Sequence, residues 1–501
     1  MKAKQTKFLI DLKTGELMHE KCIPVPFDES TMDEMKEASV VGLFPTYTYQ
    51  TFEGYGCSMT ESSCYLLSQM DAETRREALK CWFGPEGMNA RFIRMHLDSV
   101  DFSLSEYQAV ADPIADPELT TFNIDRDRQY IIPVVKEALS LCEKPLSVLI
   151  SPWSPPAQWK TPPEMKANDT PIYGSASQEV DFTKPGRMFG GRLKPEHYGD
   201  WAKYMVKFIQ EYLAEGIPVT MLSVQNEPAA APFWESCLWS AQQEKTFLRD
   251  YLYPELKAAG LTDRLKIFVW DHNKERMPER IDEIMTDDVK DIVGGFAYHW
   301  YTGDHFEALD MMRQKYPDKI LMHTESCCMH IPGKTTMSED ENDTIFDPLN
   351  PLNGLSNDNS AEIDLIDAHM YAHDIIGDLN HGMQRWIDWN MILNRKGGPR
   401  HVPCGVTAPL VFEEGATFSR TMTYEYLKAF AGTIQPGCVR IGSCVFSPKV
   451  EAVAAKNPDG SIGVILLNTQ NLDMSVNIRV SGYVTEVQLP ARSLSSVIFT
   501  E

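Results

Sequence analysis

The sequence has no long hydrophobic run and comparatively few positive charges. No stretch approaches the roughly 18 apolar residues needed to span a bilayer. The 47 Lys and Arg residues against 71 Asp and Glu leave a net charge of −24. Such a negative field repels phosphate backbones and anionic lipid headgroups, so we expect neither a nucleic acid nor a membrane as a partner.

Patterns that mark disulfide frameworks and metal sites are also missing. The 11 cysteines are odd in number and form no C-x-x-C pair, and the 12 histidines show neither H-x-H nor H-E-x-x-H spacing. We therefore expect no metal and no cofactor. Near the N-terminus only Phe8, Leu9 and Ile10 form an apolar run, which is too short for a signal peptide. These features predict a cytoplasmic protein with reduced thiols.

Short apolar runs alternate with helical patterns from about residue 54 to residue 404. One helical stripe is formed by Trp201, Tyr204, Met205 and Phe208, with Gly216 at the expected C-cap. Eight runs with intervening helices predict a closed (β/α)8 barrel, with an open doubly wound sheet as the alternative. The expected strands cover residues 54–60, 90–97, 146–150, 218–224, 265–270, 293–298, 319–324 and 383–389.

The two ends of the chain have a different pattern. Apolar and polar residues alternate from Met474 to Val480, and the turn sequence at 457–460 (NPDG) separates two apolar runs, as in antiparallel hairpins. We predict that residues 1–50 and 405–501 combine into one β-sandwich domain, and that residues 51–404 form the barrel.

Polar and aromatic residues lie at or directly after the ends of the expected strands, where barrel enzymes place their functional groups. They occupy positions 151–153, 225–228, 271–273, 299–301, 324–326 and 386–390. Glu227 and Glu325 would face each other from the fourth and seventh strands. Glycoside hydrolysis needs one protonated and one ionised carboxyl group. The alternative is that both are ordinary strand-end acids paired with Arg or Lys.

Aromatic residues at the same strand ends favour a sugar ligand. Trp153, Trp300, Tyr301 and Trp389 all fall on this face. Indole rings stack on the C–H faces of sugar rings, while Asp, Asn and Arg bond the hydroxyl groups. A single tryptophan is more often part of a core, whereas four aromatic residues on one face support a carbohydrate site.

Several ordered motifs resemble glycoside hydrolase family 30, especially its glucosylceramidase-like branch. They are residues 54–60 (GYGCSMT), 94–103 (RMHLDSVDFS), 151–161 (SPWSPPAQWKT), 225–228 (QNEP), 298–301 (YHWY), 324–327 (TESC) and 386–399 (WIDWNMILNRKGGP). The β-rich tail is also similar to the side domain of that family. The resemblance implies a (β/α)8 barrel with a β-sandwich, retaining β-glycosidase chemistry and no metal.

The resemblance also assigns roles. It makes Glu227 the acid/base and Glu325 the nucleophile. The matching substrate-binding positions are Asn226 for the sugar 2-hydroxyl, Asp101 and Trp153 for the outer hydroxyls, Trp389 closing the same subsite, Arg94 beside the nucleophile, and His299 and Tyr301 on the floor.

We expect an exo-acting β-glucosidase whose partner is a small-molecule or oligosaccharide β-glycoside. A β-xylosidase or an endo-β-1,6-glucanase of the same family would keep the same motifs. Outside the family, a metal-dependent barrel hydrolase and a non-catalytic sugar-binding protein stay open. Although the branch is linked to sphingolipid metabolism, the net charge of −24 favours a soluble substrate over a lipid-bound one. The sequence carries no signal for the oligomeric state.

Overall fold

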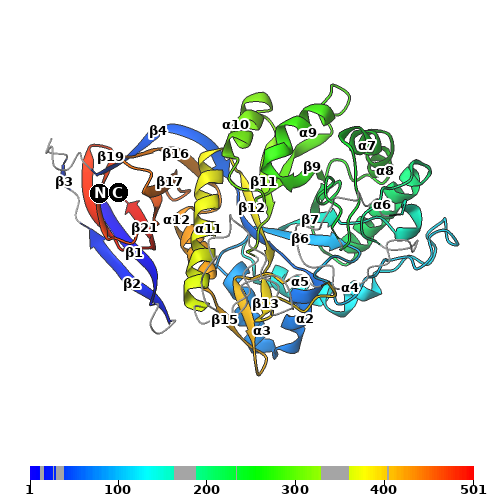
Figure 1. The fold of residues 1–501 in the computed structure, drawn as a ribbon, viewed down its shortest axis with the longest axis horizontal. Helices are drawn as coiled ribbons and strands as arrows, with labels where there is room; N and C mark the ends of the chain where they lie inside the picture. The colour runs from blue at the N-terminus through cyan, green and yellow to red at the C-terminus, as the bar shows by residue number, and fades with distance from the viewer. Residues whose placement is uncertain are drawn as a thin grey trace, which may run out of the picture.

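The computed structural model (Figure 1) describes residues 1–11, 16–25, 28–29, 39–162, 188–232, 234–328, 360–402 and 405–500. It contains a closed barrel of parallel strands and a β-domain that includes both ends of the chain. Of the predicted N-terminal sandwich segment, residues 12–15, 26–27 and 30–38 lie outside the described residues. Within the described part of the chain, no helix has the length and apolar character needed to cross a membrane.

The barrel closes in the order β10-β11-β12-β5-β6-β7-β8-β9, with every neighbouring pair parallel. This confirms the predicted (β/α)8 barrel. Its strands are β5 (Gly54–Ser58), β6 (Phe92–Leu97), β7 (Ser147–Pro152), β8 (Val219–Ser223), β9 (Lys266–Asn273), β10 (Val293–His299), β11 (Ile320–Glu325) and β12 (Arg385–Asn390).

Helices cover the outside of the barrel. They are α2 (Glu61–Gln69), α3 (Ala72–Phe83), α4 (Asp125–Gln129), α5 (Ile131–Leu141), α6 (Tyr198–Ala214), α7 (Ala241–Phe247), α8 (Tyr253–Ala258), α9 (Met277–Ile284), α10 (Phe306–Lys315) and α11 (Ser360–Asn380), with short turns such as η4 (Lys274–Arg276). Helix α6 buries the predicted stripe, including Trp201, Tyr204 and Phe208, against the strands. The chain leaves this helix through Gly216, whose φ of 81° is a conformation that favours glycine.

An apolar layer fills the barrel interior below the site. It consists of Phe92, Leu149, Met221, Phe268, Ala297, Ile320, Met322 and Ile387. Strands in a closed barrel alternate inward and outward side chains, so a filled layer of this kind leaves polar inward positions only near the strand ends. The layer therefore forms the floor beneath the residues described below.

The β-domain joins the two ends of the chain. Its ten-stranded sheet has the order β2-β1-β21-β18-β17-β16-β4-β19-β20-β3. The strands are β1 (Lys2–Asp11), β2 (Glu16–Val25), β3 (Asp28–Glu29), β4 (Val40–Phe52), β16 (Cys438–Val445), β17 (Val450–Lys456), β18 (Ile462–Asn468), β19 (Met474–Val480), β20 (Tyr483–Leu489) and β21 (Ser493–Thr500). The first strand, β1, pairs with both β2 and the last strand, β21, so the termini lie together in Figure 1.

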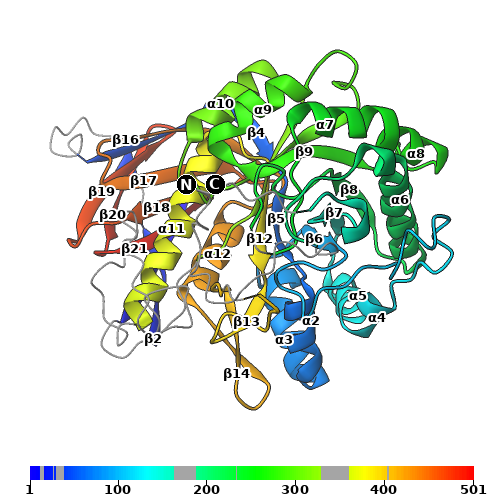
Figure 2. The same ribbon diagram turned by 45° about the vertical axis from the view of Figure 1, so that its right-hand side comes forward.

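The β-domain has its own apolar core, which includes Val41, Val464 and Val476. Helices α11 and α12 (Met422–Thr433) lie between this domain and the barrel in both views (Figures 1 and 2), and they contact β17 and β21 respectively. A small sheet of β13 (Ile392–Asn394), β14 (Leu410–Glu413) and β15 (Thr417–Arg420) follows the last barrel strand.

Candidate active site

The predicted site residues come together at the C-terminal ends of the barrel strands. Glu325 is the last residue of β11, and Glu227 lies four residues after the end of β8. The backbone of Glu227 has a φ of 47°, and Asp271, which accepts a hydrogen bond from the Glu227 N–H at 2.9 Å, has a φ of 50°. Such conformations are costly for non-glycine residues and cluster at functional sites, where the surrounding structure holds them in place.

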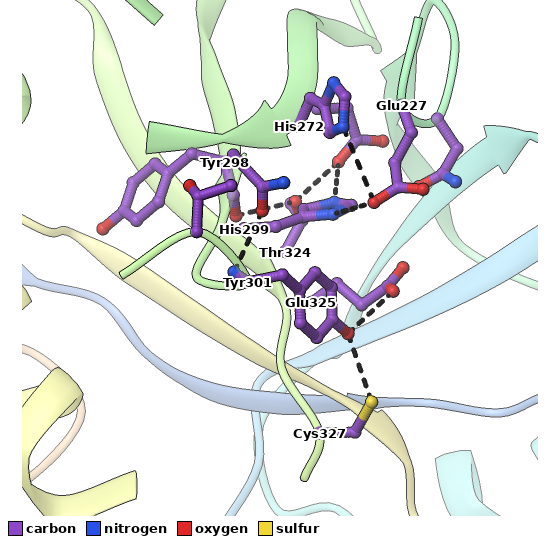
Figure 3. A network of polar contacts seen from close by, with 12 residues as sticks. Glu227, His272, Tyr298, His299, Tyr301, Thr324, Glu325 and Cys327 are labelled. Carbon is purple, nitrogen blue, oxygen red and sulfur yellow. Dashed lines mark hydrogen bonds and ion pairs between the residues drawn. The ribbon is translucent and has the colours of Figure 1, made fainter. Parts of the chain in front are cut away.

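Both carboxylate oxygens of Glu325 accept hydrogen bonds from side chains of the site. Arg94 Nη1 donates to Oε2 at 2.5 Å, and the Tyr301 hydroxyl donates to Oε1 at 2.9 Å. Glu325 is 7% exposed. The Tyr301 oxygen also lies 3.2 Å from Cys327 Sγ, as Figure 3 shows. These contacts fix the orientation of a largely buried carboxylate.

Arg94 links the nucleophile candidate to the rest of the site. Its Nη2 donates to Asn226 Oδ1 at 2.7 Å and to Asp271 Oδ2 at 3.0 Å. Burial alone would lower the pKa of this guanidinium, but the charges of Asp271 and Glu325 raise it. The buried Arg94 cation offsets the repulsion between the two carboxylates that it contacts.

No specific role was predicted for Asp271, but its buried carboxylate accepts hydrogen bonds from five residues. Donors to its carboxylate, besides Arg94, are Ser151 at 3.3 Å, Ser223 at 2.6 Å, His299 at 3.1 Å and Thr324 at 2.6 Å. Although burial opposes ionisation, Arg94 and His299 hold the pKa of Asp271 far below its usual range. The signal in the sequence was a charged residue directly after a predicted apolar strand.

Glu227 lies against two imidazoles. Its Oε1 is 3.4 Å from His299 Nδ1 and 3.8 Å from His272 Nε2 (Figure 3). Burial would raise the pKa of Glu227, but the contact with His299 and the charges around it lower this pKa. Burial would lower the pKa of His299, but Glu325, Asp271 and Glu227 together raise it to about 9. Burial lowers the pKa of His272 to about 4. At neutral pH the proton shared by this group therefore resides on His299.

The predicted aromatic residues divide into two sets. Trp153 and Trp389 stack with ring centroids 5.2 Å apart, and the Arg94 guanidinium lies 4.6 Å from the Trp153 ring centroid. Trp300 was expected on the same face, but this expectation is wrong. Its ring packs against Tyr371 of α11, 4.8 Å away, because side chains alternate direction around this strand end.

Asp101 is 7% exposed, and its chain neighbours Val100 and Phe102 pack in the same apolar cluster as Trp153 and Trp389. No residue in the described part of the chain donates a hydrogen bond to its Oδ1. Burial, followed by the charges of Glu325, Glu235 and Glu227, raises the pKa of Asp101 well above its usual value. A carboxyl group held in this way can donate as well as accept a hydrogen bond at neutral pH.

One cluster of potential metal ligands lies behind the site. Ligand atoms of His323, Asp374 and Asp378 fall within 4.8 Å of one another. The ammonium group of Lys274 lies among them, 2.5 Å from Asp374 Oδ1 and 3.0 Å from Asp378 Oδ1. His323 Nδ1 is 2.8 Å from Asp378 Oδ2, and Nε2 is 2.9 Å from the main-chain oxygen of Glu325. Lys274 thus already balances the two carboxylates, and His323 ties the cluster to the backbone of Glu325.

Comparison with known families identifies this arrangement. Residues 52–347 and 353–434 match the model of the glycosyl hydrolase family 30 TIM-barrel domain, and residues 437–497 match that of the family 30 beta sandwich domain. The chain belongs to glycosyl hydrolase family 30. As a family 30 protein it is an O-glycosyl hydrolase of the β-glycosidase type, which confirms the predicted fold class and enzyme class.

Individual relatives agree with this family. Putative glucosylceramidase 4 of Caenorhabditis elegans is 27% identical over 475 residues, covering 91% of this chain and 82% of the relative. The lysosomal acid glucosylceramidase of Mus musculus is 26% identical over 449 residues, covering 87% and 78%. The crystal structure of SrfJ from Salmonella typhimurium superposes with a TM-score of 0.83 at 28% identity, covering 100% of both chains.

Proposed function

We propose that this family 30 protein is an exo-acting, retaining β-glucosidase that hydrolyses soluble β-glucosides by double displacement. Glu325 is the nucleophile and Glu227 is the acid/base. The observation that carries the proposal is the difference between the two carboxylates. Glu325 is held at both oxygens by Arg94 and Tyr301, whereas Glu227 lies beside His299, which stores a proton.

In the first step a Glu325 oxygen attacks the anomeric carbon, and the bond to the leaving oxygen breaks as that oxygen takes a proton from Glu227. This proton reaches Glu227 from His299 across the 3.4 Å contact as the step proceeds, so neither residue holds it once the leaving oxygen has taken it. In the second step Glu227 removes a proton from water, which attacks the anomeric carbon and releases Glu325. Two inversions at this carbon give a product that retains the β configuration.

The residues around the carboxylates support a sugar in this position. Because Asn226 Oδ1 accepts from Arg94, its amide N–H groups are directed elsewhere and are suited to the sugar 2-hydroxyl. Trp153 and Trp389 offer stacked indoles, and Asp101 offers an unpaired carboxyl oxygen for the outer hydroxyls. No step of this mechanism uses a metal or a cofactor.

We further propose that the substrate is dissolved rather than presented in a lipid bilayer. Relatives named glucosylceramidase would place the chain in sphingolipid metabolism. The net charge of −24, however, disfavours approach to anionic membranes and to nucleic acids. Nine of the 11 cysteines are free thiols, and eight of these are buried or half-buried, which supports a reducing compartment such as the cytoplasm.

A panel of substrates tests the sugar and the linkage. We expect an aryl β-glucoside to be cleaved faster than an aryl β-xyloside, a β-1,6-glucan or glucosylceramide in vesicles, with β-glucose as the first product seen by NMR. A dominant rate on the xyloside or on the glucan would instead assign a β-xylosidase or an endo-β-1,6-glucanase. Release of α-glucose would refute retention.

Two substitutions test the residue roles. Glu325→Gln should abolish turnover, and Glu227→Ala should recover activity with azide on a substrate with a good leaving group, giving a glucosyl azide. Glu118→Gln, at an exposed site in the loop after β6, is the control that keeps wild-type rates. Turnover by Glu325→Gln at the wild-type rate would overturn the assignment.

A further inference from the structure

Three loops meet beside the sugar site at an ion pair that the mechanism does not use. Glu235, in the loop after β8, is 2% exposed. Its Oε1 lies 3.2 Å from Nε2 of His401, which belongs to the segment between β13 and β14. The other ring nitrogen of His401 lies 3.0 Å from the main-chain oxygen of Ser103, in the loop after β6. Burial would lower the pKa of His401, but Glu235 raises it to about 9, so the imidazole is a cation at neutral pH.

The backbone around Glu235 is held firmly. Glu235 forms a β-bridge with Phe189, and Ser236 N donates to Met188 O at 3.1 Å. The buried ammonium of Lys160 donates to the main-chain oxygens of both Met188 and Ser236 at 2.6 Å. The position of the Glu235 carboxylate is therefore set by the scaffold rather than by a free surface loop.

This carboxylate has unused hydrogen-bonding capacity. No side chain or backbone group among the described residues donates a hydrogen bond to Glu235 Oε2, although the atom is buried. A buried carboxylate oxygen without a donor is costly, and binding sites use such groups for ligands that supply the donor. The histidine cation balances the charge of Glu235 but leaves this oxygen open.

Glu235 is also close to the predicted sugar position. Its charge is among the causes that raise the pKa of Asp101, together with the charges of Glu325 and Glu227. Trp234, the preceding residue, packs against the apolar cluster that contains Trp153 and Trp389. The Glu235–His401 pair therefore lies near Asp101 and on the side of the site that carries Trp153 and Trp389.

We propose that Glu235, oriented by His401, accepts a hydrogen bond from a substrate hydroxyl beyond those held by Asp101, and so determines which β-glycosides are accepted. The proposal rests on the proposed β-glucosidase function. The donor is an alcohol group. It is either the hydroxymethyl group of the glucosyl unit or a hydroxyl of the next sugar unit.

Matched substrates separate these two sources. The set is an aryl β-glucoside, its 6-deoxy analogue, an aryl β-xyloside, and a β-linked glucose disaccharide. If the hydroxymethyl group is the donor, Glu235→Gln should lower kcat/KM for the aryl glucoside by roughly 10- to 100-fold, as expected for a hydrogen bond to a charged group. The values for the 6-deoxy glucoside and the xyloside should then hardly change. A loss confined to the disaccharide would support the same proposal with the next sugar unit as donor.

Equal losses on every substrate, or no loss on any, would overturn the proposal. His401→Gln should lower kcat/KM for the same substrates as Glu235→Gln does, because Glu235 is then no longer held in its orientation. Glu244→Gln is the matched control. Glu244 is another buried glutamate after β8, but it pairs with Arg280 at 3.0 Å, so its loss should lower the melting temperature without changing any substrate ratio.

A binding measurement keeps this test separate from the proposed function. Calorimetry measures, without turnover, how tightly wild type and Glu235→Gln bind basic sugar analogues. One inhibitor has the glucose configuration, and its counterpart has the xylose configuration and lacks the hydroxymethyl group. If the hydroxymethyl group is the donor, we expect the substitution to weaken binding of the glucose-configured inhibitor selectively. If the next sugar unit is the donor, binding of the equivalent disaccharide inhibitor should be weakened instead. If wild type cleaves no β-glycoside, the proposed function fails. If neither inhibitor pair shows selective weakening, the role of Glu235 fails.

Discussion

Replacing His299 by glutamine would remove the group that stores the acid proton in the proposed mechanism. The neighbouring carboxylates raise the pKa of His299 from 6.5 to about 9 although burial opposes protonation. A shift of this size corresponds to roughly 3 kcal/mol of interaction between the imidazolium and its surroundings. Glutamine keeps hydrogen-bonding capacity toward Glu227 and Asp271 but cannot carry the proton.

The expected result is a selective loss of acid catalysis. With an alkyl β-glucoside, whose leaving group needs protonation, we expect kcat/KM to fall about 10- to 150-fold, the range that corresponds to losing a 1.5–3 kcal/mol hydrogen bond to a charged group. With a dinitrophenyl β-glucoside, which leaves without a proton, the first step should change little. The alkaline limb of the wild-type profile should fall near pH 9, and the limb of the variant should move to lower pH.

His272→Gln is the matched control for this experiment. His272 also faces Glu227, but its pKa is lowered to about 4, so it is neutral across the same pH range. Its replacement should leave the alkaline limb in place. If His299→Gln kept the wild-type limb, or slowed both substrates equally, the proton-storage argument would be refuted.

The same pKa shift makes stability depend on pH. A raised pKa in the folded state means that folding binds a proton, so the stabilisation of roughly 3 kcal/mol is fully present below about pH 6.5. It is lost as the pH rises through about 9. Urea unfolding of wild type and His299→Gln at pH 6 and pH 9.5 should therefore show a smaller pH dependence in the variant. An identical dependence would contradict this assignment.

Two further substitutions test the scaffold behind the site. Lys274→Met should destabilise the fold by about 3–5 kcal/mol in urea unfolding, because it strands two buried carboxylates of α11 without their cation. Unchanged stability would show that these carboxylates are neutral. Gly463→Ala would place a Cβ atom 2.0 Å from Thr433 O, where β18 meets α12, so we expect a loss of about 1–3 kcal/mol and a lower melting temperature. Gly432→Ala, in the same helix with nothing within 4 Å of the added atom, should be neutral or stabilising. Equal effects at the two glycines would contradict the packing argument.

The barrel strands could be predicted because their signal is local. Each is a short, buried, mostly apolar run followed by a helix, and all eight predicted strands are present. The ends were less certain. We expected the fifth strand over 265–270, but β9 runs through Asn273 because Asp271 is internally hydrogen-bonded and the ladder continues with His272 paired to Tyr298. A change from apolar to polar residues therefore ended the predicted strand before the backbone ladder ended.

The side chains at the end of β10 follow simple alternation, so Trp300 and Tyr301 could not share one face. The pairing of β10 with both neighbours contains register shifts next to Tyr298, but the alternation continues beyond them. His299 and Tyr301 therefore reach the carboxylates, whereas Trp300 turns toward α11. The cluster of Lys274 with two aspartates was also missed, because its members are about 100 residues apart in the sequence and no local pattern connects them.

The charges of the site also explain how one residue could act first as an acid and then as a base. In the free enzyme the Glu325 carboxylate is the main charge that keeps the proton on His299, against the effect of burial. When Glu325 becomes an ester it loses this charge, so the pKa of His299 should fall after the proton has passed to the leaving group. Glu227 and His299 then stay without a proton and can accept one from water. Hydrolysis of the ester restores the charge of Glu325 as that proton arrives, and the raised pKa of His299 returns with it.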